Sequence, residues 1–187
     1  MKKICVFCGS KPGHNMQYME VARELGQTLA SMNLELIYGG ADVGTMGAIA
    51  DGAINEGGVV RGVIPQGFPC EIAHSELTEL IRVKDLQERK NLMFEMSDAF
   101  ITLPGGYGTL DELFELLTWS QLDYHQKPCG LLNVAGYFNP MLKLLDHMVT
   151  EGFLKQEHRD LVIVAEEVAE LINKLQDYDR CESQRKW

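Results

Sequence analysis

The amino-acid sequence predicts an α/β fold in which a mostly parallel sheet is covered by helices on both faces. Short apolar runs alternate along the chain with longer segments of helical period, which is the pattern of such a sheet. The 187 residues, 45% of them hydrophobic, are enough for one globular domain with a buried core. No linker, low-complexity segment or repeat divides the chain. We therefore expect a single domain over residues 1–178, followed by a frayed tail over residues 179–187.

Seven short apolar runs, rich in Val, Ile and Leu, are the predicted strands. In chain order they are Lys3–Cys8, Leu34–Tyr38, Val59–Ile64, Leu80–Val83, Ala99–Leu103, Cys129–Asn133 and Val162–Val164. Between them lie longer segments with the apolar spacing of helices that pack on a sheet. These predicted helices are Met16–Met32, Thr45–Glu56, Leu86–Ser97, Leu110–Leu122, Pro140–Glu151 and Glu166–Gln176. Because most strands are followed by a helix, neighbouring strands are expected to run parallel.

The charge balance is acidic, with 17 Lys and Arg against 27 Asp and Glu and a formal net charge of −10. Binding of a nucleic-acid polymer depends on a basic surface, so such a partner is not expected. No stretch approaches the roughly 20 apolar residues of a membrane helix. Lys2 and Lys3 lead directly into a predicted strand rather than into a signal-peptide core. We expect a cytoplasmic protein that does not enter a membrane.

Five cysteines, an odd number, favour reduced thiols over a disulfide framework. Cys5 and Cys8 have the spacing of half a zinc site, but no second pair completes four ligands. Both cysteines fall inside a predicted strand, where small thiols are ordinary core residues. The five histidines show no close repeat of metal-ligand spacing. The sequence therefore predicts no metal site.

Glycine is concentrated where predicted strands lead into helices. Three glycine-rich turns, at residues 8–13, 39–47 and 104–109, follow the first, second and fifth predicted strands. Such turns offer free backbone N–H groups and the positive end of a helix dipole, which together suit a phosphate group. Neither the dinucleotide fingerprint nor the P-loop motif occurs. Any one loop is compatible with a tight turn alone, but three at one sheet edge favour a phosphate-bearing ligand.

Two charged positions stand near these turns. Glu112 lies in the first turn of the helix after the third loop, where the helix dipole alone also favours a carboxylate. At the mouth of the phosphate cradle, that carboxylate can also stabilise a cationic transition state or orient a water. Arg89 and Lys90 begin the preceding helix; adjacent cations usually form a solvated face, yet Arg89 has a geometry that suits bidentate binding of an anion.

Residues 104–112 match Pro-Gly-Gly-x-Gly-Thr-x-x-Glu, a signature of the LONELY GUY (LOG) family. The family consists of cytokinin riboside 5'-monophosphate phosphoribohydrolases that were long mislabelled as lysine decarboxylases. Further matches extend over nearly the whole chain: Cys8-Gly9-Ser10, Gly39-Gly40 with Gly44 and Met46-Gly47, Gly62-Val63-Ile64-Pro65, Arg89-Lys90, Asp98 to Ile101, and Thr118-Trp119 through Lys127-Pro128. The chain thus resembles this family in several ordered motifs.

The resemblance implies a Rossmann-like fold and hydrolysis of the N-glycosidic bond of a purine nucleoside 5'-monophosphate to free base and ribose 5-phosphate. It also implies a homodimer with active sites near the subunit interface, and no metal or cofactor. Arg89 and Glu112 are implied as catalytic residues. The implied substrate contacts are Gly39, Gly40, Gly44, Thr45, Met46, Glu71, Arg89, Lys90, Gly105, Gly106, Tyr107, Gly108, Thr109, Leu110, Asp111, Glu112 and Thr118.

Two competing functions remain at this point. A related module can bind or sense nucleotides without turning them over; the presence of both Arg89 and Glu112 favours the enzyme. Lysine decarboxylation would need pyridoxal phosphate and a Schiff-base lysine, for which the sequence offers no evident candidate. The preferred base, adenine or an N6-substituted adenine, is left open.

Overall fold

The computed structural model describes residues 1–178 and places seven strands in one sheet. The tail predicted over residues 179–187 lies outside the described residues. The strands are β1 (Lys3–Phe7), β2 (Glu35–Tyr38), β3 (Val60–Pro65), β4 (Glu79–Val83), β5 (Ala99–Thr102), β6 (Cys129–Leu132) and β7 (Val162–Ala165). Their order is β4-β3-β2-β1-β5-β6-β7, and every neighbouring pair runs parallel. All seven predicted strands are confirmed.

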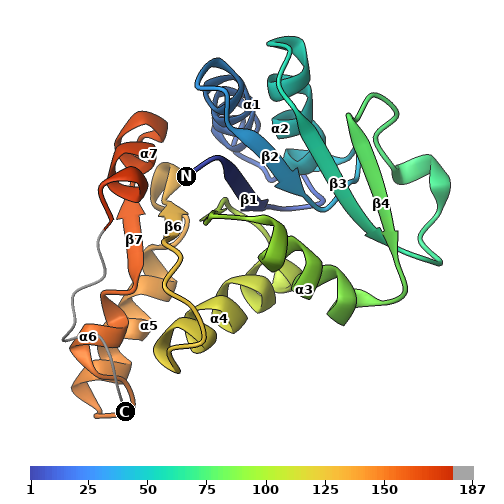
Figure 1. The fold of residues 1–187 in the computed structure, drawn as a ribbon. Helices are drawn as coiled ribbons and strands as arrows, with labels where there is room; N and C mark the ends of the chain where they lie inside the picture. The colour runs from blue at the N-terminus through green and yellow to red at the C-terminus, as the bar shows by residue number, and fades with distance from the viewer. Residues whose placement is uncertain (179–187) are drawn as a thin grey trace.

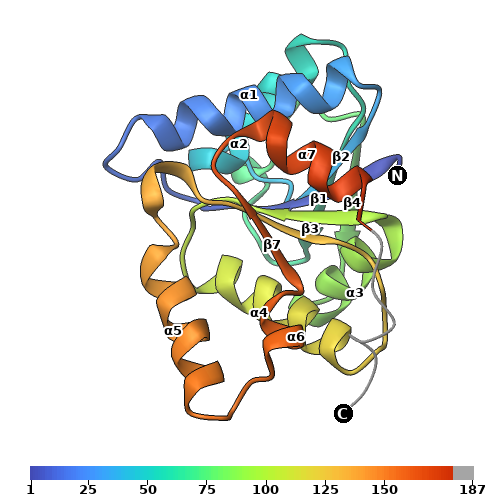
Figure 2. The same ribbon diagram turned by 90° about the vertical axis from the view of Figure 1, so that its left-hand side faces the viewer.

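Helices cover both faces of the sheet (Figure 1). They are α1 (Gln17–Ser31), α2 (Gly44–Asn55), α3 (Leu86–Met96), α4 (Tyr107–Gln121), α5 (Asn139–Thr150), α6 (Gln156–Arg159) and α7 (Val168–Gln176), with short 3-10 turns η1 (Cys70–Ile72) and η2 (Val134–Gly136). In Figure 2, α1, α2 and α7 form the layer above the sheet, and α3, α4, α5 and α6 form the layer below it. This is the three-layer, Rossmann-like arrangement that the family resemblance implied.

The core lies on both sides of the sheet because its strands are apolar on both faces. Side chains of β1 alternate between the two layers: Ile4 and Val6 pack with α1, α2 and α7, whereas Cys5 and Phe7 pack with α3 and α4. A third cluster joins α4 and α5 to β6 and β7. Cys5 and Cys8 are buried free thiols, as the strand pattern predicted.

Three helices begin earlier than the sequence predicts: α5 by one residue, at Asn139 instead of Pro140, and two others that begin at glycine-rich turns. Helix α4 starts at Tyr107 instead of Leu110, and α2 starts at Gly44 instead of Thr45. Glycine has low helix propensity, which hid these first residues. The first turn of α4 therefore contains the second half of the third glycine loop. Short elements η1, η2 and α6 have too few residues to show a period and were not predicted.

Among residues 1–178, no helix is long and apolar enough to cross a membrane.

Candidate active site

The carboxyl ends of β1, β2 and β5 meet at one edge of the sheet because these three strands are neighbours. The three glycine-rich turns follow these strands. The strand order reverses at β1, since the chain places β2 on one side of it and β5 on the other. Loops that diverge from such a switch point leave a crevice that commonly binds ligands. The fold thus brings together three turns that lie far apart in the sequence.

Two buried threonines hold the first of these turns in place. The Thr45 hydroxyl donates a hydrogen bond to the Gly9 carbonyl at 3.0 Å and accepts one from the Gly9 N–H at 2.9 Å. The Thr109 hydroxyl donates to the Cys8 carbonyl at 3.1 Å. Both residues were expected to contact substrate, which stays a prediction; in the structure their hydroxyls fix the first turn against the other two. Gly44 contributes a left-handed φ of 56° that lets the second turn approach the first.

A cavity of about 360 Å³ opens between the turns. It is lined by residues of β1, β3, α3, α4 and the connections between them. Eight of the residues expected to contact substrate line it: Gly39, Met46, Arg89, Gly106, Tyr107, Gly108, Thr109 and Glu112. The first N–H groups of α4, like those of any helix, have no acceptor within the helix, and Gly106 at the N-cap offers no side chain to accept from them. Backbone donors and the helix dipole are therefore both available at this end of the cavity.

Helix α3 places Arg89 in the cavity through a well-defined start. The Asp85 carboxylate accepts a hydrogen bond from the Glu88 N–H at 2.9 Å, and the Glu88 carboxylate accepts one from the Lys84 N–H at 2.6 Å. These two bonds satisfy backbone donors at the helix start, as in a capping box. The first turn of α3, and with it the direction of the Arg89 side chain, is fixed from both sides.

Arg89 and Glu112 form an ion pair in the wall of the cavity. Arg89 Nη1 lies 3.0 Å from Glu112 Oε1, and Arg89 Nε donates to the Val63 carbonyl at 2.9 Å. The Arg89 side chain passes directly beside Gly39: a β-carbon on Gly39 would collide with the guanidinium group and with the Met46 methyl group. Glycine at position 39 is therefore required for this position of Arg89.

Burial gives Glu112 an unusual affinity for protons. The residue is only 9% exposed. Loss of hydration raises the pKa of the Glu112 carboxyl from 4.5 to about 7, although the adjacent Arg89 guanidinium lowers it and the Asp111 charge raises it further. A carboxyl that titrates near neutral pH is suited to accept or donate a proton during a reaction.

A second ion-pair group links α3 and α4 beside the cavity. Lys90 Nζ lies 3.1 Å from Asp111 Oδ2 and 3.0 Å from Glu115 Oε2. Its charge is therefore already balanced by two carboxylates. In the structure Lys90 makes a contact between helices, and its expected contact with the substrate stays a prediction.

The remaining residues expected to contact substrate do not line the main cavity. They are Gly40, Gly44, Thr45, Glu71, Lys90, Gly105, Leu110, Asp111 and Thr118. Glu71 is exposed on η1, next to Ile72, which does line the cavity. Thr118 lies on α4, where its hydroxyl donates to the Phe114 carbonyl at 2.7 Å, and it lines a separate cavity of about 210 Å³ beside α5.

Sequence patterns missed one wall of the main cavity. Phe68 and Ile72, from the connection between β3 and β4, line it together with residues of the glycine turns. No motif singles them out, because the connection reaches this place only through tertiary contacts. An isolated antiparallel bridge pairs Ala41 with Ala73 and attaches the connection to the turn after β2.

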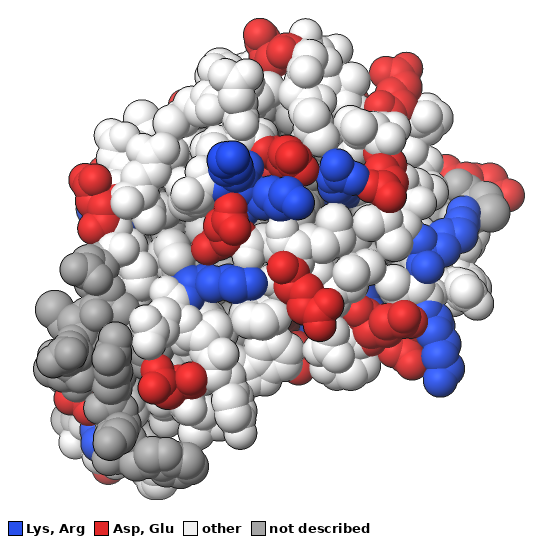
Figure 3. Space-filling view, viewed as in Figure 1, with Lys and Arg blue, Asp and Glu red and all other residues white. Residues whose placement is uncertain are grey.

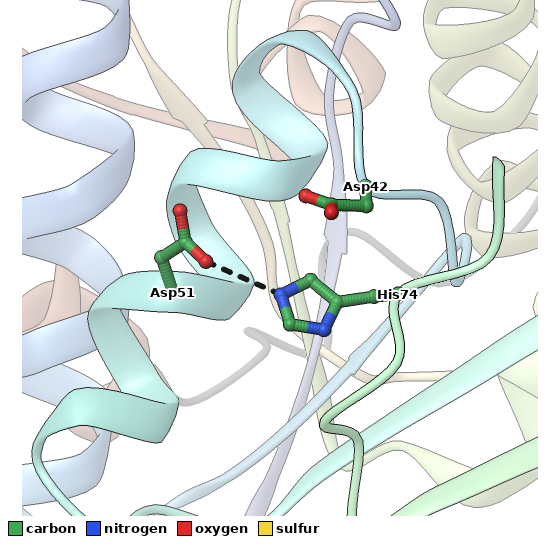
Figure 4. Close-up of side chains that lie close together, drawn as sticks. All are labelled: Asp42, Asp51 and His74. Carbon is green, nitrogen blue, oxygen red and sulfur yellow. Dashed lines mark hydrogen bonds and ion pairs between the residues drawn. The ribbon is translucent and has the colours of Figure 1, made fainter. Parts of the chain in front are cut away.

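The structure also brings together Asp42, Asp51 and His74, whose ligand atoms lie within 4.8 Å of one another (Figure 4). The spacing of cysteines and histidines along the chain predicts no metal site, and it does not reveal this grouping, which forms only in the fold. The Glu76 N–H donates to His74 Nδ1 at 3.2 Å, so the ring proton is on Nε2, which faces Asp51 Oδ1 at 3.2 Å. A metal on Nε2 would instead require a proton on Nδ1, where a donor already points. The hydrogen bonds thus fit a clamp better than a metal site.

Charges are mixed on the face that carries α3 and α4. In Figure 3, Lys and Arg side chains lie among Asp and Glu side chains across the middle of this face. The two ion pairs of Lys90 join helices α3 and α4. A basic surface wide enough to follow a nucleic-acid backbone is not visible in this view of the described residues.

Comparison with known proteins gives one family and several close relatives. The profile of the family described as "Possible lysine decarboxylase" matches residues 46–175. A cytokinin riboside 5'-monophosphate phosphoribohydrolase of Arabidopsis thaliana is 46% identical over 100% of this chain and 90% of its own length. An enzyme of the same name from Rhodococcoides fascians is 48% identical over 89% of this chain and 85% of its own.

Solved structures share the fold at lower identity. The molybdenum cofactor carrier protein of Chlamydomonas reinhardtii superposes with a TM-score of 0.71 at 24% identity, over 95% of this chain and 99% of that one. This likeness shows that the two proteins share a fold.

Proposed function

The chain belongs to the LOG family, the possible lysine decarboxylase family that includes the cytokinin riboside 5'-monophosphate phosphoribohydrolases, and from this premise we propose its reaction. It hydrolyses the N-glycosidic bond of a purine ribonucleoside 5'-monophosphate, AMP or an N6-modified AMP. Water supplies a hydroxyl group to C1' of the ribose, and the base departs with the bonding electrons and a proton. The products are the free base and ribose 5-phosphate.

The observation that carries this proposal is the pair of half-buried Arg89 and buried Glu112 in a cavity lined by glycine turns. Cleavage of a ribosyl bond develops positive charge on the sugar, which a nearby carboxylate stabilises. Glu112 is such a carboxylate, and its pKa of about 7 also allows it to take a proton from the attacking water. A protein that only binds nucleotides needs the glycine turns but not this pair.

Phosphate binding by the backbone explains how an acidic chain holds an anionic substrate. The first turn of α4 offers N–H groups beside Gly106, and the helix dipole adds partial positive charge. Binding energy from a phosphate remote from the reacting bond helps to position that bond against the catalytic groups. We infer that the 5'-phosphate lies at this end of the cavity and the ribose lies near Glu112.

Arg89 has a supporting role in this mechanism. An arginine keeps its charge in proteins and is therefore a poor proton donor. Its ion pair with Glu112 keeps part of the carboxyl population ionised, and its bond to the Val63 carbonyl holds it in place. We infer that Arg89 orients Glu112 and contacts the ribose or phosphate when substrate binds.

A direct assay tests the reaction. Purified protein is incubated with AMP and with N6-isopentenyl-AMP, and free base and ribose 5-phosphate are measured by chromatography. Glu112→Gln is expected to lower kcat at least about a hundredfold, as removal of one group that stabilises transition-state charge does. Glu170→Gln, on the exposed surface of α7, is the matched control and is expected to keep wild-type activity.

The same assay separates the alternatives. Wild-type protein that binds AMP but releases no base would support a binding or sensing module instead. Decarboxylation of lysine has little structural support, because no lysine of the described residues lines the main cavity and a pyridoxal Schiff base would need one. Comparison of kcat/KM for the two nucleotides identifies the preferred base.

We also propose that residues 1–178 act as one domain and that the protein is a cytoplasmic homodimer. Leu144 on α5 is 52% exposed, and Phe153 in the loop after α5 is 86% exposed. Burying these apolar side chains against a second copy would remove them from water. Light scattering is expected to give twice the mass of the chain, and Phe153→Lys is expected to shift the protein toward the monomer. Three buried free thiols are compatible with a reducing compartment.

A further inference from the structure

The connection between β3 and β4 forms one wall of the main cavity. The position of this wall depends on the contacts that attach the connection to the rest of the fold. Phe68 and Ile72 contribute this wall, and Gly106 and the start of α4 line the same cavity. Neither belongs to a strand of the sheet. The distance between this wall and the glycine turns therefore depends on what holds the connection in place.

Backbone hydrogen bonds join the connection to the turn after β2. The Asp42 N–H donates to the Ile72 carbonyl at 2.7 Å, and the His74 N–H donates to the Gly40 carbonyl at 3.0 Å. Ala41 and Ala73 lie opposite each other between these two bonds. This pairing is too short to be stable alone, since even a two-stranded hairpin is marginal in water.

The His74 side chain extends this attachment to a regular helix. It is 7% exposed, and its Nε2–H donates to Asp51 on α2 at 3.2 Å, while its Nδ1 accepts from the Glu76 N–H at 3.2 Å. Figure 4 shows the imidazole reaching from the connection toward Asp51 on the helix. One side chain thus connects the cavity wall to α2, whose first turn belongs to the second glycine loop.

We propose that His74 is a positioning residue for the substrate cavity, acting through Asp51 to hold the Phe68–Ile72 wall against the glycine turns. The proposal rests on the proposed nucleotide substrate. Arg89 and Glu112 lie on α3 and α4, which the clamp does not touch. Loosening the clamp should therefore weaken substrate binding and leave the chemical step nearly unchanged.

A pair of substitutions isolates the bond to Asp51. His74→Gln carries an amide N–H at about the reach of Nε2, whereas His74→Asn keeps an acceptor near Nδ1 but is too short to reach Asp51. We expect His74→Asn to raise KM for AMP about fivefold to tenfold, which corresponds to about 1–1.4 kcal/mol, with kcat changed less than twofold. His74→Gln is expected to restore most of the binding. Equal KM values for wild type and His74→Asn would overturn the proposal.

Two further variants test the partner and exclude a metal. Asp51→Ala is expected to raise KM as His74→Asn does, and the double variant should be no worse than either single one. Asp42→Asn is expected to have no effect, because the Asp42 carboxylate does not take part in the clamp. If Asp42→Asn raised KM as much as His74→Asn does, and if Zn²⁺ raised Tm in wild type but not in His74→Asn, the cluster would be a metal site and the proposal would be wrong.

Measurements without turnover keep this test separate from that of the proposed function. Kd for AMP, measured by calorimetry, should follow the same order as KM even in a protein that releases no base. Hydrogen exchange of the free protein should show faster exchange at Asp42 and His74 in His74→Asn. Ile172→Val, buried on α7, controls for general loss of stability and should leave Kd and exchange at these amides unchanged. Unaltered exchange and Kd in His74→Asn would refute the clamp.

Discussion

Gly39→Ala tests whether the position of Arg89 controls activity. The added β-carbon would overlap the Arg89 guanidinium and the Met46 methyl group, so the guanidinium must retreat by about 1 Å to reach van der Waals distance. Its two anchors, the Val63 carbonyl at 2.9 Å and Glu112 at 3.0 Å, do not move with it. Displacement of a catalytic group by about 1 Å costs roughly a hundredfold in rate, or about 2.7 kcal/mol of transition-state stabilisation.

The folded state should tolerate this change better than the reaction does. Both groups that meet the new methyl group are the ends of flexible side chains, and Gly39 is not in the left-handed region. We expect kcat/KM for AMP to fall about a hundredfold while Tm changes by no more than about 4 °C, as measured by steady-state kinetics and calorimetry. Gly57→Ala, where a β-carbon meets no atom but φ is 73°, provides a control that affects stability and not kinetics. Wild-type kcat/KM in Gly39→Ala would refute the link between this glycine and Arg89.

Three other variants and conditions extend this reasoning. Because catalysis uses ionised Glu112, kcat should rise with pH, with a midpoint at about 7, and then level. Arg89→Met removes the charge that lowers the Glu112 pKa and should move this midpoint to higher pH. A kcat independent of pH between 5 and 9 would contradict the role assigned to Glu112. Thr45→Val leaves the buried Gly9 N–H and carbonyl without their partner and should lower the free energy of unfolding by about 2–4 kcal/mol in urea titrations, with an unchanged value as the contrary result. Asp85→Ala removes the N-cap of α3 and should lower the free energy of unfolding by about 1 kcal/mol in the same titration. Asp85→Asn keeps a side-chain acceptor at the N-cap and should retain most of the wild-type stability.

The sheet and its glycine turns could be predicted because each strand is a local pattern. A run such as residues 99–102 is buried throughout and apolar except for Thr102, and the turn that follows contains three glycines. The start of α4 could not be placed correctly, because Gly106 caps that helix without a side chain and Gly108 lies inside its first turn. The low helix propensity of glycine disfavours a helix at residues 106–108, and tertiary packing outweighs this propensity.

The site was predictable only as far as it depends on motifs. Arg89 and Glu112 were both singled out, but their contact could not be foreseen, since it depends on how α3 and α4 lie on the sheet. Phe68, Ile72 and His74 carry no recognisable pattern. Phe68 and Ile72 line the cavity, and His74 lies behind them, because backbone bonds join segments whose sequences do not indicate pairing.

The central place of β1 has a consequence for the order in which the protein folds. Ile4 pairs with Leu36 on one side and with Ala99 on the other, so one edge of β1 stays open until β5 is available. Pairings across such sequence distances form slowly, and an open apolar strand edge is prone to wrong association in the meantime. During synthesis, the first two glycine turns exist as soon as β1 and β2 pair, whereas the third turn and Glu112 follow β5. Catalytic activity should therefore appear only after the two halves of the sheet have joined, and refolding at high protein concentration should lose yield at that step.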